Sequence, residues 1–323
     1  MQFLSALLSS MPGAAAQGLI WGVMAIGVYI TYKILDVADL TVDGSLCTGG
    51  AVCVILTLNG CPMPVALIAA VIAGMLAGFI TGIFHTAFGI PAILAGILTQ
   101  LALYSVNLHI MGWGTDNGSK ANLPISVDKY KLLVSSRYVR DIKVDNPIFI
   151  LAIFLIIIIF VLYWFFGTEL GSSLRATGAN GNMARAQGIN TDFTKVLGLM
   201  ISNGLVALSG ALLSQYQGFS DINMGRGAIV IGLAAVIIGE VMFGKVFRNI
   251  GARLLAVSIG AIVYYIVLQI VLQIGLSTND LKLITALIVA LFLTLFLTLS
   301  YLNLKKTRRK PRRAAKEGVK QHA

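Results

Sequence analysis

Charged residues are scarce in this chain of 323 residues: 11% are Asp, Glu, Lys or Arg, while 57% are hydrophobic. Soluble domains carry about 25% charged residues. The shortage excludes a soluble globular protein, and with it the usual estimate of domain number from length. Cysteine is also rare. Cys47, Cys53 and Cys61 lie in one apolar stretch and offer neither a Cys–His metal site nor a disulfide framework.

Patterns of catalytic residues are missing as well. No GxSxG, HExxH or helical pair of carboxylates occurs, and His85 and His109 are isolated. The run from Gly239 to Lys245 matches the start of a phosphate-binding loop, but Val246 stands where Ser or Thr must bind magnesium. We therefore expect no enzyme, no metal site and no cofactor bound by this chain.

Long uncharged runs are what the chain has instead. About 20 apolar residues suffice for a helix to cross a bilayer. Nine hydrophobic segments meet or approach this length, near residues 15–35, 44–59, 63–84, 91–112, 147–167, 196–216, 227–243, 254–275 and 282–303. They predict an all-α polytopic membrane protein with about nine transmembrane helices, within a range of eight to ten.

Glycine is abundant, with 34 residues. Gly74, Gly78 and Gly82 recur every four residues and so share one face of a helix. Small residues let transmembrane helices approach each other closely. We expect this face to pack inside the chain rather than to form a dimer seam.

Basic residues predict the orientation. The tail 305–323 carries nine Lys or Arg and one acidic residue. A basic tail after an apolar helix is typical of a cytoplasmic anchor on anionic membrane lipid, and not of a folded nucleic-acid interface. With the C-terminus in the cytoplasm, loop 168–195 is cytoplasmic, and loop 113–146 and the N-terminus lie outside. Residues 1–304 then form the transmembrane domain.

The nine segments divide into four, one and four, which predicts two inverted-repeat halves at about 15–112 and 196–303. Three identities separated by 182 residues support the division: Gly22, Ala25 and Asp39 correspond to Gly204, Ala207 and Asp221. In each half a polar turn and a short apolar segment follow the first long segment, at 44–59 and 227–243.

Short segments at equivalent places in two repeats indicate a transport site near the membrane centre. The polar residues beside them are the candidates for the substrate path: Asp39, Thr41, Asp43, Ser45, Asp221, Asn223 and Arg226. The alternative is a structural role for the acidic residues, because carboxylates suit the positive ends of helices.

The segment from Glu169 to Lys195 is rich in small residues. Asn180 or Asn182 can cap a short helix, and Gly188 can end it. The segment is either an ordinary connector or a coupling helix that docks in a groove of a separate ATPase. The residues considered for coupling are Arg175, Gly178, Asn180, Ala184, Arg185 and Gly188.

This loop carries a resemblance to a known family. The pattern Leu-Arg175-Ala-x-Gly178-x-Asn180, then Ala184 and Gly188-Ile, resembles the cytoplasmic loop of permease subunits of bacterial ABC importers in the ribose and branched-chain amino-acid class. The opening from Gly18, with Asp39-Leu-Thr-Val-Asp43-Gly-Ser, is more specifically similar to the branch linked to tryptophan or tyrosine uptake. The resemblance covers roughly residues 15–303 and leaves out the basic tail.

The resemblance implies a permease in the bacterial cytoplasmic membrane that translocates a small solute, with an amino acid, and an aromatic one in particular, as the first candidate. It also implies the partners: an ABC ATPase subunit that binds the ATP, an extracytoplasmic solute-binding protein and a second permease copy in a homodimer. The alternative is an ion-coupled secondary transporter. That class needs an unpaired acid or base deep in a span, and only Glu240, near the end of a span, comes close.

Overall fold

A computed structural model describes residues 2–114, 118–126, 129–130, 132–139, 146–244, 247 and 249–273, together with positions 283, 286–287, 289–291, 294 and 298. Side-chain surroundings are described from residue 9 onward. The predicted segment 282–303 and the tail 305–323 therefore lie largely or wholly outside the described residues.

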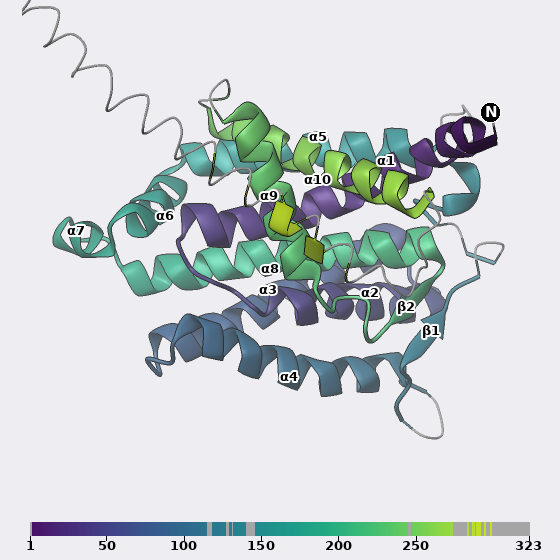
Figure 1. Cartoon of the computed structure of the whole chain (residues 1–323). Helices are drawn as coiled ribbons and strands as arrows, with labels where there is room; N and C mark the ends of the chain where they lie inside the picture. The colour runs from purple at the N-terminus through teal and green to yellow at the C-terminus, as the bar shows by residue number, and fades with distance from the viewer. Residues whose placement is uncertain are drawn as a thin grey trace, which may run out of the picture.

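The described chain is helical apart from one short ribbon (Figure 1). Six helical stretches are long and apolar enough to cross a membrane. They are α1 (Gln2–Tyr29) continued by the π-helix η1 (Ile30–Ile34), α3 (Met63–Thr86), α4 (Ala92–Met111), α5 (Pro147–Gly167), α8 (Thr191–Gln217) and α10 (Ile250–Gln273). The other described helices are α2 (Val42–Leu58), α6 (Glu169–Ala179), α7 (Gly181–Ala186), α9 (Ala228–Phe243) and the 3-10 turn η2 (Ser136–Tyr138).

Eight of the nine predicted segments coincide with described helices, and the ninth falls on the undescribed region. The two segments predicted to be short are α2 and α9, both apolar and both shorter than a membrane span. The sequence therefore located the helices well, and the chain is a multi-pass membrane protein.

Close backbone contact explains the glycine row on α3. A side chain at Gly74 would collide with Ala207 and the carbonyl of Asn203, and one at Gly78 would collide with the carbonyl of Leu199, all on α8. The expectation of packing within the chain is thus confirmed. Gly18 of α1 lies in the same way against Ile262 of α10, where an added Cβ would be 2.6 Å from the Cα. Helices α3 and α8, and α1 and α10, are accordingly pressed together along their lengths.

The helices run side by side, and their two ends carry different structures (Figure 1). Helices α6 and α7 lie at one end, whereas the N-terminus lies at the other, near the ribbon of β1 (Asn122–Pro124) and β2 (Phe219–Asp221). The two strands are antiparallel, with Asn122 opposite Asp221. The ribbon joins the loop after α4 to the connection between α8 and α9, an association that the sequence did not predict.

One local prediction needs correction. The segment after α5 contains two short helices, α6 and α7, instead of one. The hydroxyl oxygen of Thr168 accepts a hydrogen bond from the Gly171 amide at the start of α6, and the chain breaks at Asn180, where the backbone is extended. Two successive N-caps therefore divide the segment.

Candidate translocation path and coupling segment

Asp39 lies in the turn between η1 and α2 and is 3% exposed. Its Oδ1 accepts a hydrogen bond from the Thr41 amide at 2.9 Å, and its Oδ2 accepts one from Nδ2 of Asn203 at 2.6 Å. Asn203 is on α8, so the carboxylate ties the turn to a different membrane span. Both oxygens have donors, which is what a buried carboxylate requires.

The same network extends to three further helices, α2, α3 and α4. Oδ1 of Asn203 accepts a hydrogen bond from the Ser45 hydroxyl at 2.6 Å. The hydroxyl of Thr41 lies 2.7 Å from that of Thr81 on α3, which in turn donates to Thr99 on α4 at 2.9 Å. We call these six residues the Asp39 network: Asp39, Thr41, Ser45, Thr81, Thr99 and Asn203. The network is buried and cross-links α2, α3, α4 and α8, and three of the path candidates, Asp39, Thr41 and Ser45, belong to it.

Asp43 has a different environment, although it is only four residues further on. Its Oδ2 accepts a hydrogen bond from the Gly227 amide at 2.9 Å and its Oδ1 one from the Ile229 amide at 3.0 Å. The carboxylate of α2 therefore caps the first turn of α9. Because amides at a helix start point outward and carry partial positive charge, Asp43 marks the place where the N-termini of the two short helices meet.

A cavity of about 400 Å³ opens beside this meeting point. It is lined by Asp43, Gly44, Cys47, Gln100, Leu101, Tyr104, Asn107, Ile222 and Arg226. The guanidinium carbon of Arg226 lies 6.0 Å from the centre of the Tyr104 ring. Tyr104 belongs to α4, so Arg226 lies beside a helix that is long and apolar enough to cross a membrane.

Asn107 supplies a buried polar group to the same cavity. Its side chain is 1% exposed, and its Nδ2 donates a hydrogen bond to the Gly44 carbonyl at 3.4 Å. Among the described residues, its Oδ1 has no hydrogen-bond partner. A buried acceptor without a donor costs about 1–3 kcal/mol, so this oxygen is available to a donor group that enters the cavity.

Asp221 and Asn223 lie at the edge of this region and stabilise a turn. Oδ1 of Asp221 accepts a hydrogen bond from the Asn223 amide at 2.7 Å, and its Oδ2 accepts one from Nδ2 of Asn122 at 3.2 Å. The structure thus divides the seven predicted path residues. Asp39, Thr41 and Ser45 join the Asp39 network, Asp221 and Asn223 hold the ribbon and its turn, and Asp43 and Arg226 line the cavity.

Several site residues were missed by the sequence analysis. Asn203, Thr81 and Thr99 complete the Asp39 network, and Asn107 and Tyr104 complete the cavity wall. Each is a lone polar side chain inside an apolar run. A polar side chain in such a run must find a partner inside the protein. Its occurrence in the sequence could therefore have been used to predict these residues.

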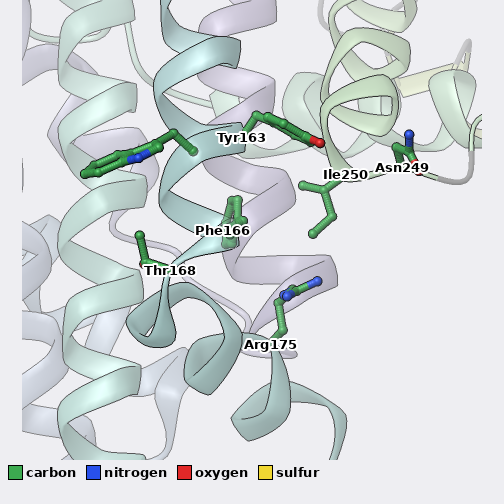
Figure 2. Close-up of a pocket in the computed structure, with 8 residues that line it drawn as sticks. Tyr163, Phe166, Thr168, Arg175, Asn249 and Ile250 are labelled. Atoms are coloured by element: carbon green, nitrogen blue, oxygen red, sulfur yellow. The ribbon is translucent and has the colours of Figure 1, made fainter.

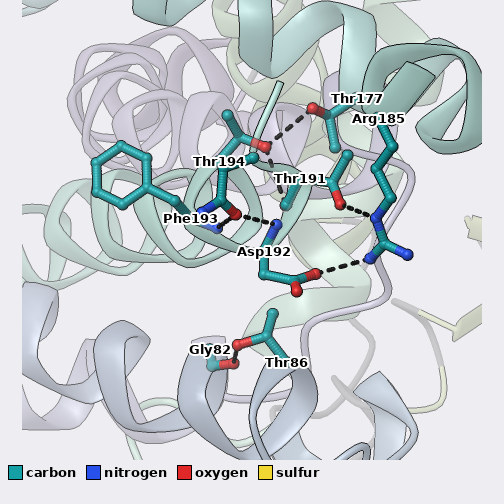
Figure 3. Close-up of polar contacts among 9 residues, drawn as sticks. Gly82, Thr86, Thr177, Arg185, Thr191, Asp192, Phe193 and Thr194 are labelled. Atoms are coloured by element: carbon teal, nitrogen blue, oxygen red, sulfur yellow. Dashed lines mark hydrogen bonds and ion pairs between the residues drawn. The ribbon is translucent and has the colours of Figure 1, made fainter. Parts of the chain in front are cut away.

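The candidate coupling segment is held together by N-caps and by the side-chain contacts of Arg185. Asn180 accepts a hydrogen bond from the Met183 amide at 3.1 Å and starts α7, and Gly188 has a left-handed backbone with φ of 82°. Arg185 donates to the Thr191 hydroxyl at 2.6 Å and forms an ion pair with Asp192 at 2.9 Å (Figure 3). Helix α7 is therefore fastened to the start of α8.

Two coupling candidates are turned toward their own chain. Ala184 is 2% exposed and packs against its own chain, and the coupling role considered for it stays a prediction. A side chain at Gly178 would collide with the carbonyl of Ile34 at the end of η1. Met183 on α7 and Phe193 at the start of α8 are large hydrophobic residues that this segment exposes, at 63% and 54%.

Glu240, the acid that an ion-coupled transporter could have used, has a partner. Its Oε1 lies 3.2 Å from Nζ of Lys33, which joins α9 to η1. A paired acid near a helix end is not the isolated titratable group that proton coupling needs.

Comparison with known proteins identifies the family. A family model described as "Branched-chain amino acid transport system / permease component" matches residues 10–298. A tyrosine transport system permease protein of Clostridioides difficile is 40% identical, covering 80% of this chain and 81% of its own. An uncharacterised protein of Rickettsia prowazekii is 38% identical, covering 78% and 85%.

A third relative is more distant. The autoinducer 2 import system permease protein LsrC of Salmonella typhimurium is 28% identical, covering 78% of this chain and 69% of its own. The match to the family model spans the buried network, the cavity and the coupling segment alike. The chain therefore belongs to the branched-chain amino acid transport system permease family and is a permease component of an ABC importer, with no catalytic role of its own.

Proposed function

We propose that this permease imports an α-amino acid, with an aromatic one as the first candidate, through the cavity beside Asp43 and Arg226. The single observation that carries the proposal is the meeting of two short helices, α2 and α9, at Asp43 beside a cavity that Arg226 and Asn107 also line. Interrupted helices with converging N-termini are a common way to bind polar substrates inside a membrane.

The cavity has groups for each part of such a substrate. Arg226 can bind a carboxylate, and the free Oδ1 of Asn107 can accept a hydrogen bond from an ammonium group. The Tyr104 ring and Leu101 provide apolar contact for a side chain. The relative from Clostridioides difficile, named as a tyrosine permease, supports an aromatic amino acid.

We also propose an architecture of nine transmembrane helices in two inverted halves, about 15–112 and 196–303. The pairing of helices supports it, because the first long helix of each half packs on the third helix of the other, α1 on α10 and α8 on α3. The shortened helices α2 and α9 hold equivalent places. In this arrangement α6, α7 and the tail 305–323 lie in the cytoplasm, and the ribbon of β1 and β2 lies outside.

The assembly follows from the family. An ABC importer permease works with an ATPase and a solute-binding protein, and we propose that a second copy of this chain completes the path. The exposed side chains of Met183 on α7 and Phe193 at the start of α8 are then the contact for the ATPase. The ion pair between Arg185 and Asp192 would transmit the motion of the ATPase to α8.

The test combines identification with uptake. The tagged permease is used to isolate its solute-binding protein, and the bound ligand is identified by mass spectrometry. Uptake of that ligand is then measured in cells carrying the natural permease or Arg226→Gln. We expect the bound ligand to be an amino acid and its uptake to fall strongly in Arg226→Gln. A ligand without a carboxylate, or normal uptake in Arg226→Gln, would reject the proposal.

A further inference from the structure

A second cavity lies at the opposite side of the helix bundle from the proposed path. It measures about 540 Å³ and is found where α5 ends, α6 begins and α10 starts (Figure 2). Its walls include Tyr163, Trp164, Phe166, Arg175, Asn249 and Ile250. None of these residues contributes to the cavity at Asp43, so the proposed transport function does not account for it.

Arg175 gives this cavity its charge. The side chain extends from α6 toward Ile250 and Asn249, at the start of α10 (Figure 2). Among the described residues, no hydrogen bond or ion pair to its guanidinium is found, in contrast to Arg185, which is bound to Thr191 and Asp192. The two arginines of the segment therefore differ: one fastens the fold, and the other faces an open cavity.

The other walls place the cavity at the boundary of the membrane. Tyr163 and Trp164 lie in the last turns of α5 and are 55% and 69% exposed. Helix α5 is the most exposed of the six candidate spans, since 22% of its 18-residue apolar stretch is buried. Tyr and Trp are enriched where hydrocarbon meets headgroups, because their rings combine an apolar body with a polar edge. The cavity thus has one side toward lipid tails and one side, at Arg175, toward water.

The position of Arg175, close to Tyr163 and Trp164 at the membrane boundary, suits binding of a lipid phosphate. Basic pockets between transmembrane helices on the cytoplasmic side bind anionic headgroups, and guanidinium binds phosphate in a bidentate manner. The opening toward the lipid-facing helix α5 favours a lipid over a protein partner.

We infer that this cavity binds the phosphate-bearing headgroup of an anionic phospholipid, held by Arg175 and Asn249, with its acyl chains along α5. The bound lipid joins α5, α6 and α10 at the root of the coupling segment. Lipid composition would then influence the position of α6 and α7. This site is separate in sequence from the basic tail 305–323.

Trp164 itself can report the bound lipid. A full-length variant with Trp21→Phe and Trp113→Phe is reconstituted in vesicles in which dibrominated phosphatidylglycerol or dibrominated phosphatidylcholine replaces part of the lipid. Bromine quenches tryptophan fluorescence at short range. We expect quenching at Trp164 to show a preference of about threefold or more for phosphatidylglycerol, equivalent to about 0.7 kcal/mol.

Arg175→Gln should reduce that preference to about one, while Lys120→Gln, which removes an exposed charge after α4, should keep it. If the Trp21→Phe change prevents folding, the Trp113→Phe variant serves, since Trp21 is 7% exposed and remains shielded. Equal quenching by the two lipids, or an unchanged preference in Arg175→Gln, would overturn the inference.

Two further experiments distinguish a lipid site from a site for free phosphate and from a contact with the ATPase. Inorganic phosphate added in excess should leave the preference unchanged, and loss of the preference would show a site for free phosphate instead. The ATPase subunit should remain bound to Arg175→Gln in detergent without anionic lipid. Its release together with an unchanged lipid preference would assign the cavity to the ATPase. Neither arm depends on which solute is transported.

Discussion

Asp39 and Asp43 are four residues apart in one motif, yet the fold uses them for different purposes. Asp39 is buried, and each of its oxygens accepts a hydrogen bond: one from the nearby Thr41 amide and one from Asn203 on α8. Asp43 caps α9 and forms part of a cavity wall with Arg226. Both carboxylates have a donor at each oxygen, so the difference lies in their surroundings. Asp39 is enclosed by side chains of other helices, whereas Asp43 lies beside a cavity with Arg226 and the unpaired Oδ1 of Asn107, and we propose a transport role only for the second site.

The largest effect is expected in the Asp39 network. Asp39→Ala leaves the Thr41 amide and the Asn203 side-chain amide without their acceptor. Each buried donor left unpaired costs about 1–3 kcal/mol, so we expect a large loss of stability and of assembled protein. Thermal unfolding and size-exclusion chromatography in detergent measure this. Asp39→Asn keeps the shape and one of the two acceptor oxygens, so it should lose less stability than Asp39→Ala. A melting temperature unchanged in Asp39→Ala would refute the structural role.

The same contrast can be tested on α7, where neighbours differ in burial. Ala184→Glu places a charge at a position that is 2% exposed and should destabilise the permease itself. Met183→Glu changes a side chain that is 63% exposed, so the permease should fold normally while co-purification of the ATPase falls. The two results separate packing from partner contact. A stable Ala184→Glu that loses only the ATPase would instead place Ala184 at the contact with the partner.

A moderate effect is expected where α3 packs on α8. Gly78→Leu forces a side chain against the carbonyl of Leu199, and overpacking costs about 1–3 kcal/mol. We expect a lower melting temperature with normal membrane insertion. Leu76→Ala on the same helix, where Leu76 is 55% exposed, is the control that should change little. Equal stability of both variants would mean that α3 and α8 are not in close contact.

These contrasts also mark the limit of the sequence analysis. Apolar runs located α5 and α8, and the Asn180 and Gly188 signals located the ends of α7, because those features depend on nearby residues. The role of Asp43 depends on amides at Gly227 and Ile229, which are 184 and 186 residues away along the chain. The three-residue strands β1 and β2 have no periodic pattern of their own, and the burial of Ala184 depends on packing outside its helix. Tertiary contacts of this kind cannot be read from local patterns.

Arg226 should show the smallest effect on stability and a large one on transport. Arg226→Gln removes the proposed carboxylate ligand, and loss of a charged hydrogen bond worth about 1.5–3 kcal/mol lowers affinity by about tenfold or more. The melting temperature should stay close to that of the natural protein. Lys120→Gln, an exposed cation outside the cavity, should leave both properties unchanged. Reduced stability with normal initial uptake would reverse the assignment.

The most direct measurement of the central claim is solvent access at the two regions. In a chain whose Cys47, Cys53 and Cys61 are replaced by Ser, single cysteines are introduced as Tyr104→Cys in the cavity and Thr81→Cys in the Asp39 network. A small, charged, membrane-impermeant thiol reagent is applied from each side of reconstituted vesicles. We predict that Cys at position 104 reacts and is protected by the transported amino acid, while Cys at position 81 does not react. Rapid reaction at position 81 with none at position 104 would contradict the account.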